Sequence, residues 1–196
     1  MAGSREAPTT AIVRAVSSIS CEVFATTFSK LRGAANIPLM PERPESVAMD
    51  PEVQRTLAAD LFNYCWTLIE KEDRTERETD RMIDAAHASR FFWEPIGEPV
   101  HHARGEWQIS RAYAVAGRSD SALFHARRSL EICEANGIAD FDLAYAYEAI
   151  ARAHSVAGEA GPAAEWAAKA RRAADDIADP DDRELLLSDL ADVTKT

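Results

Sequence analysis

The five histidines are the side chains of this sequence best suited to acid–base or metal chemistry. His102 and Glu106 stand four residues apart, and His87 lies on the segment before them. Imidazole and carboxylate groups that converge from two helices are a common zinc ligand set. The sequence has no HExxH pattern, no repeated Glu-x-x-His pair and no Cys/His cluster, and such loose sets are more often ordinary surface or hydrogen-bonded histidines. We therefore assign no metal and no cofactor, and keep His87, His102 and Glu106 as candidates for a small metal- or ligand-dependent enzyme.

His87 has the strongest case for proton transfer. It lies in "DAAHASRFFW", after two alanines and before an aromatic run, which predicts partial burial. Near Asp84 or Glu106 it could act as a general base. The alternative that we favour is a core histidine that donates to a backbone carbonyl. No G-x-S-x-G motif and no glycine-rich phosphate loop is present, so the sequence favours a binding protein over an enzyme.

The helices that must position these residues have regular start and stop signals. Asp50 is a good N-cap with Pro51 at the first helical position, and "TERE" at 75–78 fits a capping box. Glycine and proline punctuate the later segments. The predicted helices cover residues 51–71, 76–93, 100–116, 120–135, 141–157, 162–178 and 180–193. Nothing between them has a strand pattern, so the fold class predicted is all-α.

Two copies of one unit follow each other along the chain. "ISRAYAVAGRSDSALFHARRSLEI" at 109–132 aligns with "IARAHSVAGEAGPAAEWAAKARRA" at 150–173, an offset of 41 residues. An offset of this size suits two helices and two turns. Small residues such as Ser110 and Ala122 let antiparallel helices approach closely, and Gly117 can end the first helix in a left-handed conformation. Because one hairpin cannot bury its apolar stripe alone, we expect the hairpins to stack.

The first copy resembles a tetratricopeptide repeat (TPR), a family of stacked helical hairpins. The matching positions are Ile109-Ser110, Ala112-Tyr113, Gly117, Ala122-Leu123 and Leu130. The second copy has His154 in place of the tyrosine and Arg171 in place of the closing leucine, and both copies lack the closing proline. Residues 51–97 fit a third, degenerate unit, and "DDRELLLSDLADV" fits a terminal cap. The resemblance implies a divergent TPR-like domain over 49–196, with about three stacked antiparallel hairpins and a C-terminal capping helix.

The stretch from Trp66 to Trp107 is also similar to small bacterial TPR-like proteins without an assigned activity. TPR-like arrays bind on a concave face lined by the first helix of each pair, so the resemblance implies a groove for a peptide or partner protein. The residues projected onto that groove are Asn63, Arg104, Trp107, Gln108, Arg111, Tyr145, Glu148 and Arg152. Guanidinium groups bind carboxylates through paired hydrogen bonds, and Trp and Tyr supply rigid apolar contact. The alternative is internal pairing, since Glu148 and Arg152 lie four residues apart on one helix.

The charge of the chain excludes some classes of partner. The net charge is −11, and residues 1–50 hold five of the 33 acids and five of the 22 bases, so the rest of the chain carries the whole excess. An acidic body repels nucleic-acid phosphates and anionic membranes. No apolar run reaches about 18 residues. Three cysteines without C-x-x-C spacing indicate reduced thiols. We expect a cytoplasmic protein that binds neither nucleic acid nor membrane.

Residues 1–48 differ from the rest in composition and end in the proline-bearing stretch "NIPLMPERPES". They lack the continuous hydrophobic region of a secretory signal. We interpret them as a disordered N-terminal extension, or as an over-extended gene start, since Met49 directly precedes a helix opening. An organelle transit peptide is the alternative, and Glu6 and Glu22 count against it.

The sequence therefore predicts a non-catalytic helical-repeat module that binds a peptide or partner protein. The alternative is the small enzyme described above. The "RFFW" segment at 90–93 is an apolar patch that a homodimer could bury, so self-association also stays open.

Overall fold

The computed structural model describes residues 49–193, so the predicted extension at 1–48 lies outside the described residues. The described helices are α3 (Pro51–Ile69), α4 (Glu76–Trp93), α5 (Pro99–Val115), α6 (Ser119–Asn136), α7 (Asp140–Val156), α8 (Ala160–Ala173) and α9 (Pro180–Val193). A single 3-10 turn, Ala174–Asp176, follows α8, and this part of the chain contains no strand. The prediction of an all-α fold is confirmed.

Helix boundaries follow the predicted signals, with one exception. The Asp50 side chain accepts hydrogen bonds from the backbone N–H of Glu52 and Val53, and Thr75 forms the full capping box with Glu78. The exception is α8, which ends at Ala173 rather than near 178. Ile177 there adopts extended backbone and is buried, because the chain must turn to place α9.

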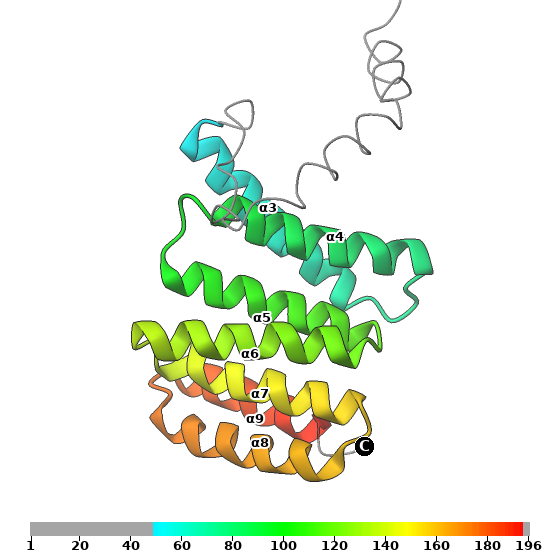
Figure 1. Ribbon diagram of the computed structural model, residues 1–196, viewed down its shortest axis with the longest axis vertical. Helices are drawn as coiled ribbons and strands as arrows, with labels where there is room; N and C mark the ends of the chain where they lie inside the picture. Colours follow the sequence, from blue (N-terminus) through cyan, green and yellow to red (C-terminus); the bar gives the residue numbers. More distant parts are fainter. Residues whose placement is uncertain (1–48, 194–196) are drawn as a thin grey trace, which may run out of the picture. The chain divides into compact units, whose positions relative to one another are not determined.

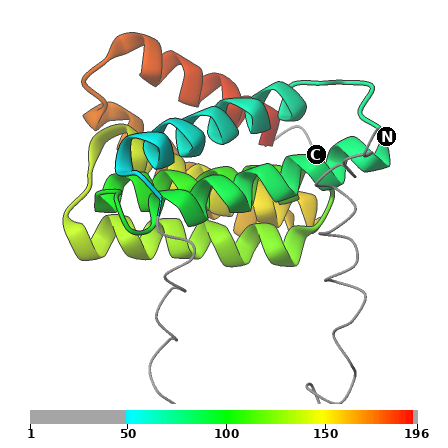
Figure 2. The same cartoon turned by 90° about the horizontal axis from the view of Figure 1, so that it is seen from above.

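The helices form three antiparallel hairpins, α3 with α4, α5 with α6, and α7 with α8, which stack in chain order (Figure 1). The first helices of the pairs also touch in succession, α3 against α5 and α5 against α7. The last helix, α9, packs against both α7 and α8. Seen from above, α9 lies at the edge opposite α6 (Figure 2). It is therefore on the side of the first helices.

The turns of the second and third hairpins repeat each other at the offset of 41 residues. The N–H of Arg118 donates to the carbonyl of Tyr113 at 2.9 Å, and the N–H of Glu159 donates to that of His154 at the same distance. Gly117 and Gly158 have φ of +71° and +75°, the left-handed region that only glycine adopts without strain. The repeat predicted from the sequence is thus present in the backbone.

The helix crossings repeat as well. Ser110 and Ala122 are both buried, and the Ser110 hydroxyl donates to the Ala122 carbonyl at 2.8 Å. Ala151 and Ala163 occupy the matching places and are also buried. Alanine makes up more than half of the buried apolar residues described, which allows close helix approach but leaves little side-chain area to stabilise the fold. No helix in residues 49–193 is long and apolar enough to span a membrane.

Candidate functional site

Aromatic side chains join the three first helices across one face. The Trp107 ring on α5 lies between Trp66 on α3 and Tyr145 on α7, with centroid distances of 5.5 and 5.2 Å. Arg104, Trp107 and Arg111 stand at intervals of three and four residues, so they form one stripe along α5. We call this surface, made by Asn63, Trp66, Arg104, Trp107, Arg111, Tyr145, Glu148 and Arg152, the first-helix face. The residues projected from the sequence are therefore brought together, except for Gln108.

Gln108 is not available to a ligand. It is fully buried, and its amide donates to the Phe62 carbonyl at 2.9 Å. It joins α5 to α3 because it points between the helices rather than across them. Its assignment to an open groove is corrected on that ground.

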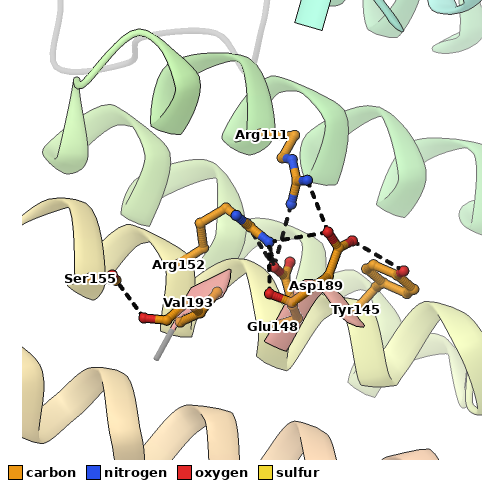
Figure 3. A network of polar contacts seen from close by, with 7 residues as sticks. All are labelled: Arg111, Tyr145, Glu148, Arg152, Ser155, Asp189 and Val193. Carbon is orange, nitrogen blue, oxygen red and sulfur yellow. Dashed lines mark hydrogen bonds and ion pairs between the residues drawn. The ribbon is translucent and has the colours of Figure 1, made fainter. Parts of the chain in front are cut away.

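A cluster of charges lies at the centre of the first-helix face (Figure 3). Glu148 is fully buried, and its Oε1 accepts from Arg152 Nε at 2.7 Å and from Arg111 Nη1 at 3.4 Å. The alternative of internal pairing between Glu148 and Arg152 is thus what the structure contains. We call Arg111, Glu148 and Arg152, together with Asp189, the arginine clamp.

Asp189 of α9 completes the clamp from a distant part of the sequence. Its carboxylate receives Arg111 Nη2 at 3.1 Å, lies 3.5 Å from Arg152 Nη2, and accepts from the Tyr145 hydroxyl at 3.3 Å. Arg152 also donates to the Asp189 backbone carbonyl at 3.3 Å. Both arginines are therefore engaged by the chain's own acids.

Burial controls the protonation of the clamp. It raises the pKa of Glu148, and the charge of Asp189 adds to this, while Arg152 and Arg111 act in the opposite direction without cancelling it. Burial also raises the pKa of Tyr145, with Asp189 and Glu148 as further causes. The Tyr145 hydroxyl therefore keeps its proton and acts as a donor to Asp189.

Three buried polar atoms of α5 and α7 have no hydrogen-bond partner among the described residues. They are Trp107 Nε1, Gln108 Oε1 and Glu148 Oε2. An unpartnered buried donor or acceptor is costly and uncommon. The aromatic and charged parts of this region thus hold hydrogen-bonding capacity that the fold does not use.

A small pocket opens at the α3 end of the first-helix face. Its volume is about 170 Å³, and its lining residues are Ala59, Phe62, Asn63, Trp93, His101 and Arg104. Trp93 and His101 are stacked with ring centroids 4.3 Å apart. Arg104 is held at the rim by a two-point contact with Asp142, at 2.6 and 2.9 Å. The pocket has aromatic walls, with one amide and one guanidinium at its edge.

Glu106 does not belong to the predicted metal set. It is buried, and its partners are Arg90 at 3.3 Å, Arg128 at 3.5 Å and His125 at 2.7 Å. Burial acts to raise its pKa, but the bond from His125 and the charges of Arg128 and Arg90 outweigh this and lower it. His102 instead lies 3.3 Å from the Trp93 carbonyl. No group of three or more potential metal ligands occurs within 49–193.

His87 is exposed, and its Nε2 meets the Tyr113 hydroxyl at 3.1 Å rather than a backbone carbonyl. The interpretation as a core histidine is therefore wrong. Partial burial and the neighbouring His125 lower the pKa of His87. The ring is mostly neutral at neutral pH, which fits a hydrogen bond to Tyr113.

Cys65 and Cys133 are buried and free. Burial raises the pKa of Cys65 to about 12 and that of Cys133 to about 11. Neither thiol forms an appreciable thiolate at neutral pH, so both serve packing, as the sequence predicts. Cys21 lies outside the described residues.

Four residues important to these sites are not found by sequence reasoning. Trp66, Asp142, His125 and Asp189 each complete a contact with a residue far along the chain. The 41-residue repeat aligns α5 with α7 but gives no register for α3 or α9. A helical wheel of α9 that set Asp189 beside Leu186 and Leu190 would have been the one usable signal.

Comparisons of the chain with known protein families, with curated proteins and with solved structures give no match. Its function is therefore argued from the geometry of its own surfaces.

Proposed function

We propose that this protein is a non-catalytic TPR-like binding module that holds a peptide, or a segment of a partner protein, on the first-helix face. The hairpins repeat at a fixed offset, which supports the TPR-like assignment of residues 49–196. The free, buried thiols fit a reducing compartment, so the cytoplasm is the proposed location.

The pocket between α3 and α5 is the observation that carries the proposal. Its 170 Å³ equals the share of liquid occupied by about six water molecules, enough for one apolar side chain. Phe62 and Trp93 offer rigid apolar walls. Asn63 can exchange hydrogen bonds with a peptide backbone, because an amide both donates and accepts. One anchored side chain with backbone contact beside it is a common mode of peptide recognition.

The arrangement of the titratable groups supports binding rather than catalysis. Glu106 is neutralised by Arg90, Arg128 and His125, so it is a poor proton acceptor. His87 bonds to Tyr113 at the surface and does not stand in the pocket. A second copy of the chain is the alternative partner, and light scattering at two protein concentrations distinguishes it from a foreign peptide.

The experiment is selection from a random peptide library displayed on phage, followed by binding measurements on purified variants. Ala59→Trp fills the pocket with an indole, and it should weaken binding of a selected peptide about tenfold or more. Ala168→Trp is the matched control, because Ala168 is an exposed alanine on α8. Peptides that bind Ala59→Trp as tightly as the wild type would contradict the proposal, as would a selection that yields no binder.

A further inference from the structure

We propose that α9 is a displaceable occupant of the first-helix face, and that the ligand replacing it is an acidic amphipathic helix of a partner protein. This rests on the proposed function and names the chemistry of the ligand. The displaced helix supplies the pattern: one carboxylate at Asp189, with buried apolar residues Leu186, Leu190 and Val193 around it.

The charge balance of the arginine clamp requires an acid in this place. With α9 seated, Arg111 and Arg152 face two carboxylates, Glu148 and Asp189. Without α9, two guanidinium groups would share only Glu148, whose pKa burial already raises. An uncompensated, partly buried positive charge is unfavourable. Any chain segment that takes the place of α9 must therefore bring its own carboxylate.

The clamp also recognises the backbone of a helix. Arg152 donates to the Asp189 carbonyl at 3.3 Å, and the Ser155 hydroxyl donates to the Val193 carbonyl at 3.0 Å (Figure 3). The last carbonyls of a helix lack partners within that helix. These donors therefore favour the C-terminal turn of a helix over an extended peptide.

The seat beneath α9 retains unused hydrogen-bonding groups. Trp107 and Tyr145 pack in the same cluster as Leu186 and Leu190. The Trp107 Nε1 and the Glu148 Oε2 have no partner among the described residues while α9 is bound. A ligand that satisfies either atom would gain contacts that α9 does not make. The seat therefore suits an external helix at least as well as the internal one.

α9 is the least buried of the helices that meet at the clamp. Three of its 14 residues are buried, against nine of the 17 in α7. Leu185 and Leu187 are exposed on its outer side, with 54% and 40% of their surface accessible. Helices with few buried contacts open locally without unfolding the domain. α9 can thus leave while the three hairpins remain folded.

The test uses a fluorescein-labelled peptide with the sequence of residues 179–196 and the full chain. In Asp189→Lys, the lysine faces two arginines, so α9 is expelled and the peptide should bind about tenfold or more tightly than to wild type. Glu184→Lys is the matched control, since Glu184 is exposed on the same helix, and it should bind like wild type. A peptide carrying asparagine in place of Asp189 should lose most of its affinity, because it brings no carboxylate.

Equal binding of the peptide to wild type and to Asp189→Lys would overturn the inference, as would binding that does not depend on the peptide's Asp189. Hydrogen exchange on the wild-type protein provides a second measurement in case the variant does not fold. The α9 amides should exchange about a hundredfold faster than those of α7, and equal rates would overturn the inference. Failure here leaves the pocket intact, because Ala59→Trp tests the proposed function independently of α9.

Discussion

The ion pair between Arg111 and Asp189 joins α5 to α9, and its strength can be measured by a double-mutant cycle. Nη2 of Arg111 and Oδ1 of Asp189 are 3.1 Å apart, and the two side chains are 16% and 21% exposed. At an effective dielectric constant of about 20, the gross attraction at this distance is roughly 5 kcal/mol. Desolvation and the competing contact with Glu148 offset most of it, so we expect a net coupling of about 1 kcal/mol.

The cycle consists of Arg111→Ala, Asp189→Ala and the double variant, each unfolded in urea at neutral pH and low salt and followed by circular dichroism. Asp189→Ala also loses the bond from Tyr145, so its free energy of unfolding should fall by about 2 kcal/mol. This corresponds to a drop in Tm of roughly 4–8 °C for a domain of this size.

The control is Glu184→Ala, an exposed acid on α9, which should change the free energy of unfolding by less than about 0.5 kcal/mol. Losses from the two single variants that add up within about 0.3 kcal/mol in the double variant would refute the proposed coupling.

Three further predictions concern the repeat and the buried acid. Gly117→Ala should cost about 1 kcal/mol in urea unfolding, since φ is +71° and nothing lies within 4 Å of the added Cβ; Gly161→Ala, equally open but without positive φ, should be neutral or slightly stabilising. Ala122→Leu and Ala163→Leu should each cost about 1–3 kcal/mol in thermal unfolding, because they overpack equivalent crossings; a cost at only one of them would argue against equivalence. Burial raises the pKa of Glu148 above its ordinary 4.5, so the stability it contributes at low pH is lost as pH rises through the raised pKa. The difference in free energy of unfolding between wild type and Glu148→Gln should therefore fall from pH 4.5 to neutral pH, and an increase would contradict the assigned direction.

The helices were predictable because their signals are local. Asp50, Thr75 and Gly117 each act within a few residues of their own position, through caps and a left-handed turn. The repeat was predictable because α5 to α8 use the same small residues at the same spacing. The end of α8 was not, because the buried position of Ile177 depends on α9, which packs against α7 and α8.

The site was only partly predictable because its contacts are distant in sequence. The residues lining α5 and α7 follow from helical spacing, but Asp189 lies 78 residues after Arg111 and on no repeated element. The acids of α9 have the pattern of a solvated face, so nothing local distinguishes Asp189 from Asp181 or Glu184. The pairing within the clamp therefore becomes apparent only once α9 is placed.

The central claim is that the first-helix face is a binding surface whose present occupant is α9. The most direct measurement is a two-dimensional ¹H–¹⁵N NMR titration of Asp189→Lys with the peptide of residues 179–196. We predict that the indole N–H signal of Trp107 shifts, together with amides of α5 and α7 around Arg111 and Arg152. Shifts confined to α4, α6 and α8, or no shift at saturating peptide, would contradict the claim.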